Sequence, residues 1–352
     1  MSCSFGEKFR VTVFGQSHSE MTGVVIDGIP AGKKLDFEKI KSFMARRAPK
    51  ISAGSTARKE ADEFEIVSGI VDGITCGAPL CALIKNTDAR SADYEKLRRL
   101  PRPSHADFAA YIKHNGFNDI RGGGNFSGRM TAPLCFAGAV AMQMLEEKGI
   151  FTGAHIERIA DVCDESFDSV NVSSSELDKI KEKDFPVLNE SAKEKMLLKI
   201  EEAKEKNDSV GGSIQCAVTG MPVGVGEPIF DGLESIISRA VFAVPAVKAI
   251  EFGSTRDYGS ENNDPFTVRN GKIVTETNNH GGILGGLSSG MPIVFSVKMK
   301  PAPSIGQAQK TVDLETMTET ELEIGGRHDA CILPRAVPCI EAATAIAIIN
   351  LI

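Results

Sequence analysis

Two long apolar segments constrain the fold of this chain most strongly. Residues 132–145 and 342–352 carry apolar side chains on nearly every helical face, yet each is shorter than the roughly 20 residues that a membrane span needs. A helix that is apolar all round has to be covered on all sides. We therefore expect two buried core helices, at residues 131–149 and 338–350, enclosed between other layers of structure.

Shorter patterns predict the elements around these helices. Segments rich in β-branched residues predict strands at residues 11–14, 23–27, 64–70 and 80–85. Residues 36–47 have the spacing of an amphipathic helix, whose apolar face is formed by Phe37, Ile40, Phe43 and Met44. The first 150 residues therefore combine strands with helices.

A repeated sequence pattern, which we call the internal echo, occurs in two distant parts of the chain. Residues 24–32 (VVIDGIPAG) and 216–224 (CAVTGMPVG) both fit a strand followed by a Gly-apolar-Pro-x-Gly turn. A helix follows each turn, and the second, at residues 231–244, begins as a capping box of Asp231 and Glu234. We expect two similar halves, about 1–150 and 210–352, each a sheet with helices on one face. Chance similarity of turn residues is the alternative.

The middle of the chain has a different composition. Residues from about 155 to 208 are highly charged and poor in glycine. Ser191 and Glu194 have the spacing of a capping box before a helix whose apolar stripe is Met196, Leu197 and Ile200. We expect a charged surface excursion from a single domain that spans residues 1–352.

Composition narrows the class of protein. The 352 residues are 42% hydrophobic and 25% charged, which suits a globular core, and a net charge of −7 disfavours a nucleic-acid partner. The N-terminus lacks the pattern of a signal peptide, and neither apolar segment fits a membrane anchor. Eight cysteines without a CxxC pair favour reduced, packed thiols over a metal site. We expect a cytoplasmic enzyme.

Three of the six histidines lie in loops rich in glycine or proline. His18 follows a predicted strand, His105 lies in the RPSHAD segment at residues 102–107, and His328 lies in the GGRHD segment at residues 325–329. Imidazole is the side chain best suited to proton exchange near neutral pH. A single histidine is more often structural, but three in such loops favour a catalytic site.

Glycine-rich segments with flanking cations predict an anion site. The RGGGNFSGR segment at residues 121–129 precedes a buried helix, where backbone N–H groups bind anions and Arg121 and Arg129 add guanidinium forks. It matches neither a Walker loop nor a dinucleotide fingerprint, and a flexible loop is the alternative. Residues 281–290 contain so many glycines that we expect their backbone against a planar ligand. Lys300 and Ser304 follow a predicted strand.

Taken in order, these segments resemble the chorismate synthase family from about residue 5 to the last helix. The matching segments are FGQSH at 14–18, RPSHAD at 102–107, DIRGGG at 119–124, GVGEPIFD at 224–231, PAVK at 245–248, the glycine run at 281–290, GRHD at 326–329 and PRAVP at 334–338. The resemblance implies an α+β fold, a β-α-β sandwich of two antiparallel sheets around a central layer of helices, and a homotetramer.

The resemblance also implies a reaction. The expected enzyme is a carbon–oxygen lyase that eliminates phosphate from 5-enolpyruvylshikimate-3-phosphate to give chorismate. Reduced FMN is the implied cofactor, although the overall reaction is redox-neutral, and NADPH is a candidate reductant. The substrate carries a phosphate and two carboxylates and the flavin carries another phosphate, so the pocket needs many cations.

Site residues follow from the matched positions. The resemblance implies that His18 protonates the leaving phosphate, that His105 stabilises the reduced flavin, and that Asp329 with Ser17 relays the ring proton. The expected anion-binding arginines are Arg47, Arg102, Arg129, Arg327 and Arg335. The expected flavin contacts are Asn125, Phe126, Ser127, Pro245, Ala246, Gly285, Lys300, Pro301, Ala302, Pro303, Ser304 and Arg327.

Several positions depart from the family pattern. Asn125-Phe126-Ser127 stands where the family usually has Arg-Ser-Ser, and Ala53 stands where an arginine associated with NADPH is common. Gln16, Ser19 and Ser104 are further replacements beside the two histidines. We expect altered cofactor contacts but a retained function. The alternatives are a flavin-dependent oxidoreductase that consumes NAD(P)H and a non-enzymatic module that binds phosphorylated ligands.

Overall fold

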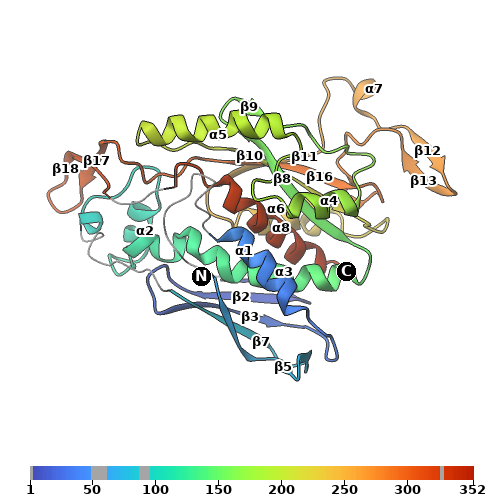
Figure 1. Ribbon diagram of the computed structural model, residues 1–352, viewed down its shortest axis with the longest axis horizontal. Helices are drawn as coiled ribbons and strands as arrows, with labels where there is room; N and C mark the ends of the chain where they lie inside the picture. Colours follow the sequence, from blue (N-terminus) through green and yellow to red (C-terminus); the bar gives the residue numbers. More distant parts are fainter. Residues whose placement is uncertain (1–2, 49–61, 87–95, 326–328) are drawn as a thin grey trace.

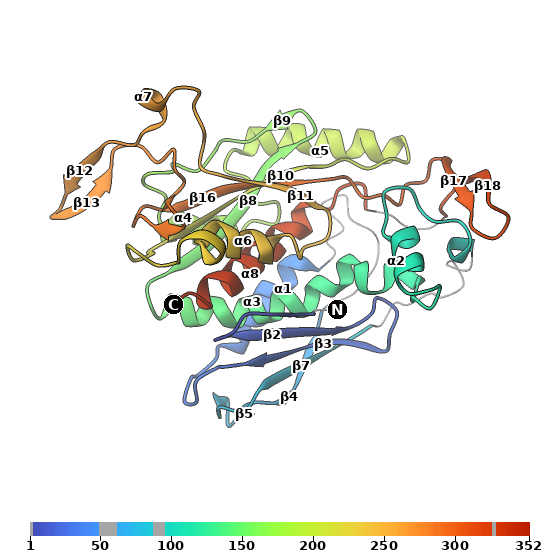
Figure 2. The ribbon, with the colours of Figure 1, turned by 180° about the vertical axis from the view of Figure 1, so that it is seen from behind.

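Two antiparallel sheets enclose a layer of helices. The computed structural model describes residues 3–48, 62–86, 96–325 and 329–352, and Figures 1 and 2 show the three layers from opposite sides. The first sheet has the strand order β1-β2-β3-β7-β4, and the second has the order β11-β16-β10-β8-β9. This confirms the β-α-β sandwich that the sequence predicted.

The first sheet comes from the N-terminal part of the chain. Its strands are β1 (Ser4–Phe5), β2 (Arg10–Gly15), β3 (Met21–Asp27), β4 (Phe64–Ser68) and β7 (Leu80–Lys85). The second sheet consists of β8 (Phe151–Ile159), β9 (Val162–Cys163), β10 (Gly212–Thr219), β11 (Val247–Phe252) and β16 (Ile293–Met299). Every residue of β10 is buried, because β8 and β16 flank it and helices cover it.

The central layer is built on the two apolar helices. They are α3 (Thr131–Glu146) and α8 (Leu333–Ile349), and they pack against α1 (Phe37–Arg47) and α6 (Leu233–Val241). A Cβ atom on Gly138 would lie 2.2 Å from the Cβ of Ala342, so only glycine allows the two helices to approach this closely. Both helices begin at the same end of the helix layer, so they run parallel to each other.

The internal echo corresponds to a repeated strand-turn-helix unit. Strand β3 leads through a turn into α1, and strand β10 leads into α6. The predicted capping box of Asp231 and Glu234 is wrong, because residues 229–231 form the 3₁₀-helix η6 (Ile229–Asp231) and Gly232 caps α6 without a side-chain bond. The last helix begins five residues earlier than expected, with Pro338 inside it, and α3 ends at Glu146 rather than at residue 149.

The charged segment lies outside the second sheet. Residues 155–159 belong to buried strand β8, so this segment begins later than the sequence indicated. Its helices, α4 (Ser174–Lys181) and α5 (Glu190–Glu205), cover the outer face of that sheet (Figure 1). Asn189 caps α5 by accepting a hydrogen bond from the Ser191 N–H at 2.9 Å, so Ser191 is not the cap. Met196 and Ile200 are buried as expected, and Leu197 is half-buried.

Small elements extend from the sandwich at both ends. The hairpin strands are β5 (Ile70–Val71), β6 (Ile74–Thr75), β12 (Phe266–Arg269), β13 (Lys272–Thr275), β14 (Ile283–Leu284), β15 (Leu287–Ser288), β17 (Gln309–Asp313) and β18 (Thr318–Leu322). The short helices are η3 (Lys96–Arg98), α2 (Asp107–Lys113), η4 (Arg121–Phe126), η5 (Gly128–Met130) and α7 (Gly259–Asn262). Within the described ranges, no helix is both long and apolar enough to cross a membrane.

Candidate active site

A cavity of about 800 Å³ lies at the end of the helix layer where α3 and α8 begin. Its lining includes the starts of both helices, through Thr131 and Ala336, and the last residue of α1, Arg47. The N-terminal ends of helices carry partial positive charge, so two of them at one cavity favour bound anions. The volume is that of a typical small-molecule site.

The structure brings most of the predicted residues to this one cavity. The predicted residues that line it are Ser17, His18, Arg47, Arg102, His105, Asn125, Phe126, Ser127, Arg129, Pro245, Ala246, Lys300, Ala302, Pro303, Ser304, Asp329 and Arg335. Pro301 and Gly285 are not among the lining residues. Arg327, His328 and Ala53 lie outside the described residues.

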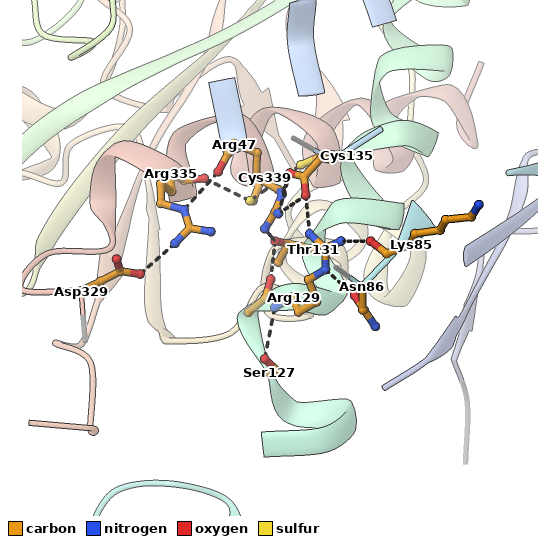
Figure 3. Close-up of polar contacts among 12 residues, drawn as sticks. Arg47, Lys85, Asn86, Ser127, Arg129, Thr131, Cys135, Asp329, Arg335 and Cys339 are labelled. Atoms are coloured by element: carbon orange, nitrogen blue, oxygen red, sulfur yellow. Dashed lines mark hydrogen bonds and ion pairs between the residues drawn. The ribbon is translucent and has the colours of Figure 1, made fainter. Parts of the chain in front are cut away.

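One side of the cavity is organised by a buried carboxylate, Asp62. Arg47 donates to it from Nε and Nη2, each at 2.6 Å, and Arg129 donates to the same carboxylate from Nη1. The Asn86 side chain then accepts from Arg129 Nε at 2.7 Å. Burial disfavours the charged form of Arg47, but Asp62 keeps the pKa of Arg47 above its ordinary value. We call Arg47, Asp62 and Arg129 the Asp62 cluster; Figure 3 shows both arginines.

A second carboxylate, Asp107, organises the other side. Arg102 forms a two-point contact with it through Nε at 2.7 Å and Nη2 at 2.8 Å, and His105 Nδ1 lies 2.6 Å from Oδ1. Burial alone would raise the pKa of Asp107, but the hydrogen bonds from Arg102 and His105 hold it well below its ordinary value. An ionised Asp107 places the proton of neutral His105 on Nδ1, which leaves Nε2 to interact with a ligand. We call these three residues the Asp107 cluster.

The two histidines lie against consecutive glycines. A Cβ atom on Gly122 would lie 2.4 Å from His18 Cε1, and one on Gly123 would lie 3.0 Å from His105 Nε2. Both glycines have positive φ, at 57° and 87°, which most other residues avoid. The Ser17 N–H donates to the Gly124 carbonyl at 3.1 Å, which joins the His18 loop to the glycine loop. The glycine loop therefore positions both imidazoles at one cavity.

The cavity carries excess positive charge. Among the described lining residues are five cations, Arg47, Arg102, Arg129, Lys300 and Arg335, and one carboxylate, Asp329. Asp62 and Asp107 contact lining side chains without lining the cavity themselves. When they are included, the count is five cations and three carboxylates. Burial lowers the pKa of Arg335, although Asp329 accepts from its Nη1 at 2.8 Å, and burial also lowers the pKa of Lys300. An anion bound here would stabilise both charges.

The glycine run at residues 281–290 packs against the backbone of its own chain, and its contact with a planar ligand stays a prediction. It forms the β14–β15 hairpin, where a Cβ atom on Gly286 would lie 2.4 Å from the Glu227 carbonyl oxygen. Gly281 and Gly282 similarly lie against backbone atoms of residues 253 and 292. Gly285 lies in the hairpin turn and does not line the cavity of its own chain.

Sequence reasoning missed several residues that hold the site. Asp107 lies inside the RPSHAD segment, and its spacing of two residues from His105 could have indicated that its carboxylate holds the imidazole. No sequence pattern indicated Asp62 or Asn86, because each lies among ordinary polar residues and is far in sequence from the arginines that it contacts. Cys339 also lines the cavity, next to Arg335 on helix α8 (Figure 3).

The fold and this cavity define a class of protein, a β-α-β sandwich with a cavity lined by cations and histidines. The profile of the family described as chorismate synthase matches residues 9–352. A chorismate synthase of Dehalococcoides mccartyi (strain ATCC BAA-2266 / KCTC 15142 / 195) is 44% identical over 100% of this chain and 96% of its own length. One of Thermococcus gammatolerans is 44% identical over 97% of this chain and 94% of its own.

A solved structure agrees with these sequences. The "Crystal Structure of Chorismate Synthase" superposes with a TM-score of 0.76 at 26% identity, and covers 99% of this chain and 92% of its own. The chain therefore belongs to the chorismate synthase family, whose members are carbon–oxygen lyases of the shikimate pathway. Membership favours the lyase over the oxidoreductase and binding-module alternatives.

Proposed function

We propose that this chain converts 5-enolpyruvylshikimate-3-phosphate into chorismate in the cavity described above, with reduced FMN bound beside the substrate. The observation that carries the proposal is the pairing of excess positive charge with two histidines held over Gly122 and Gly123. The ligands together carry two phosphates and two carboxylates, and the five lining cations supply charge of the opposite sign.

The residues present fit a flavin. Gly122 and Gly123 let the His18 and His105 imidazoles approach the loop closely at the cavity, and Phe126, which is 43% exposed, offers an apolar surface for a ring system. Lys300 and Ser304 supply a cation and a hydroxyl near Arg102, whose Nη1 lies 3.3 Å from Ser304 Oγ. We assign the flavin contacts to these residues and to Asn125, Ser127, Pro245, Ala246, Pro301, Ala302 and Pro303, and the family resemblance adds Arg327, which lies outside the described residues. A contact from Gly285 would need a second copy of the chain.

Bound reduced FMN would supply the substrate with an electron and take it back after phosphate leaves. The chain's own groups move the protons. His18 lies with Nδ1 3.2 Å from Ser17 Oγ, and we assign to Nε2 the donation of a proton to the leaving phosphate. Asp107 holds His105 through Nδ1, and we assign to Nε2 a contact that would stabilise negative charge on bound reduced flavin. Asp329 and Ser17, which both line the cavity, carry away the ring proton.

Substrate anions are assigned to the arginines near the helix starts. Arg47 and Arg129 are held by Asp62, and Arg335 is held by Asp329 and by its own Nε bond to the Arg47 carbonyl at 3.1 Å. Fixed guanidinium groups bind carboxylate and phosphate without first paying for their own ordering. Arg102, on the opposite wall, is assigned to the same role.

The test is anaerobic turnover with chemically reduced FMN, compared with aerobic turnover on NADPH alone. We expect phosphate release without net flavin oxidation in the first arm, and the second arm tests NADPH as the reductant. His18→Ala should lower kcat by about 10²- to 10⁴-fold, whereas His105→Ala should mainly weaken FMN binding. Failure to bind FMN with or without substrate, or NADPH consumption equal to product formed, would contradict the proposal.

We also propose a cytoplasmic homotetramer. The β12–β13 hairpin supports subunit contacts, because its register places Phe266, Val268 and Ile273 on one face, where they are 71%, 70% and 69% exposed. Exposed apolar faces of this kind are commonly covered by a partner. Sedimentation velocity at micromolar concentration should give the mass of four chains, and a monomer would contradict the proposal.

A further inference from the structure

Two cysteines meet where the central helices α3 and α8 begin. Cys135 Sγ lies 3.7 Å from Cys339 Sγ, and both residues are buried. One helical turn further along, Gly138 faces Ala342 at the closest approach of the helices. The sulfur atoms are therefore held together by the same close packing that forms the core. Cys339 is also among the residues that line the cavity, which places the pair at its border.

The surroundings make the two sulfurs chemically different. The Cys135 thiol donates to Cys339 Sγ, and this hydrogen bond, with the nearby charges of Arg47 and Arg335, lowers the pKa of Cys339 although burial opposes it. Burial raises the pKa of Cys135 well above its ordinary value. In its thiol form Cys339 donates to the Arg335 carbonyl at 3.3 Å. Cys339 is therefore the nucleophile of the pair, and Cys135 is the proton donor beside it.

We propose that Cys339 and Cys135 form a hydroperoxide-sensitive thiol pair, which closes reversibly to a disulfide at the floor of the cavity. This modification is separate from the proposed reaction and requires no flavin. The Cys339 thiolate attacks one peroxide oxygen, the O–O bond breaks, and Cys339 becomes a sulfenic acid while hydroxide leaves. The Cys135 thiol then attacks that sulfur, the S–O bond breaks, and water leaves. Two thiols lose two electrons, and one H₂O₂ becomes two H₂O.

The disulfide would change the cavity. A disulfide holds its sulfurs about 2.05 Å apart, so the two sulfur atoms, which are now 3.7 Å apart, must approach each other, and the Cys339 side chain must shift toward Cys135. The shift draws Cys339 away from the cavity floor, where Arg47 and Arg335 bind anions in the proposed function. Misplacement of binding groups by about 1 Å can cost about 10²-fold in rate. We expect turnover to fall by about that factor and to recover on reduction.

The experiment treats the full-length, reduced protein with H₂O₂, alkylates it under denaturing conditions and maps its peptides without reduction. The expected result is a linked Cys135–Cys339 peptide, a mass loss of two hydrogens and restoration of both thiols by dithiothreitol. Cys3, Cys76 and Cys163 are exposed and report general oxidation. Cys216→Ala removes a buried thiol elsewhere in the core and should leave the linked peptide unchanged.

Two variants separate a reactive pair from two buried, inert thiols. In Cys135→Ala, peroxide should leave Cys339 as a sulfenic acid that dimedone traps, whereas in Cys339→Ala no dimedone adduct should form at Cys135. The proposal is overturned if both thiols of the unmodified sequence alkylate fully at a peroxide dose that oxidises Cys3 and Cys76. It is also overturned if Cys339 forms its disulfide with a different cysteine. Both readouts are independent of lyase activity.

Discussion

The Asp62 cluster and the Asp107 cluster, on two sides of the cavity, have the same arrangement of charges but differ in composition. In the Asp62 cluster and in the Asp107 cluster, a buried carboxylate is shared by two basic side chains. Each carboxylate orients its bases and offsets part of their charge. The Asp62 cluster keeps one net positive charge, since it holds two arginines, whereas the Asp107 cluster pairs its carboxylate with one arginine and one imidazole. One side of the cavity therefore holds a permanent net charge, and the other holds a histidine, the side chain suited to proton transfer.

The clusters also differ in how the chain assembles them. Residues 102–107 form the Asp107 cluster within the single turn that leads into α2. The Asp62 cluster draws on the end of α1, on a loop residue before β4, and on the η5 turn. The basic side chains of both clusters line the cavity, whereas the Asp62 side chain is fully enclosed and the Asp107 side chain is 4% exposed. We infer that the Asp62 cluster stabilises the fold more, and that the Asp107 cluster matters more for proton-dependent chemistry.

Removing the enclosed carboxylate should have the largest effect. Asp62→Asn leaves Arg47 and Arg129 buried without their counter-charge, so the free energy of unfolding should fall by about 3–5 kcal/mol. Asparagine tolerates the positive φ of 51° at this position, so backbone strain should contribute little. Urea unfolding monitored by circular dichroism measures the difference.

Asp72→Asn is the matched control. Asp72 has the same φ of 51° but is exposed, so its replacement should change stability by less than about 0.5 kcal/mol. If Asp62→Asn lowers the free energy of unfolding no more than this control, the Asp62 cluster does not stabilise the fold as we infer.

The glycine loop between the walls should give the next largest effect. Gly122→Ala places a methyl group 2.4 Å from His18 Cε1, so the imidazole must move and kcat should fall by about 10²-fold. Gly123→Ala places a methyl group 3.0 Å from His105 Nε2, a less severe contact, so kcat should fall by a smaller factor. Gly128→Ala has no heavy atom within 4 Å of the new methyl and should be nearly neutral. Equal rates for Gly122→Ala and Gly128→Ala would sink the proposed role of this loop.

The smallest expected effect is a pH-dependent one on the Asp107 wall. Asp107→Asn should lower the free energy of unfolding by about 2 kcal/mol at pH 7, as for a hydrogen bond to a charged group. The folded pKa of Asp107 is depressed, so its stabilisation is complete above the ordinary pKa of 3.8 and is lost as pH falls toward the folded value. The difference between the two proteins should be constant from about pH 5 to 7 and shrink below about pH 4. A difference that grows on acidification would contradict the depressed pKa.

Much of the architecture was predictable because it rests on local patterns. Two segments without a polar face required cover on both sides, which the two sheets provide. The Pro-rich turn with His105 and the glycine loop were recognisable because their residues are contiguous. Helix starts were less predictable. Asn189, not Ser191, caps α5, because the backbone geometry selects among several candidate capping residues.

By itself, the amino-acid sequence determined that two apolar helices are buried, the supply of cations and histidines, and the family, whose resemblance implied the sandwich. Only the tertiary structure decided which carboxylate each cation meets, because ion pairing depends on distance and burial and not on order along the chain. Asp62 lies 15 residues from Arg47 and 67 from Arg129, and Cys135 meets Cys339 across 204 residues. The backbone packing of Gly281, Gly282 and Gly286 likewise appears only in the folded chain, because it depends on segments distant in sequence.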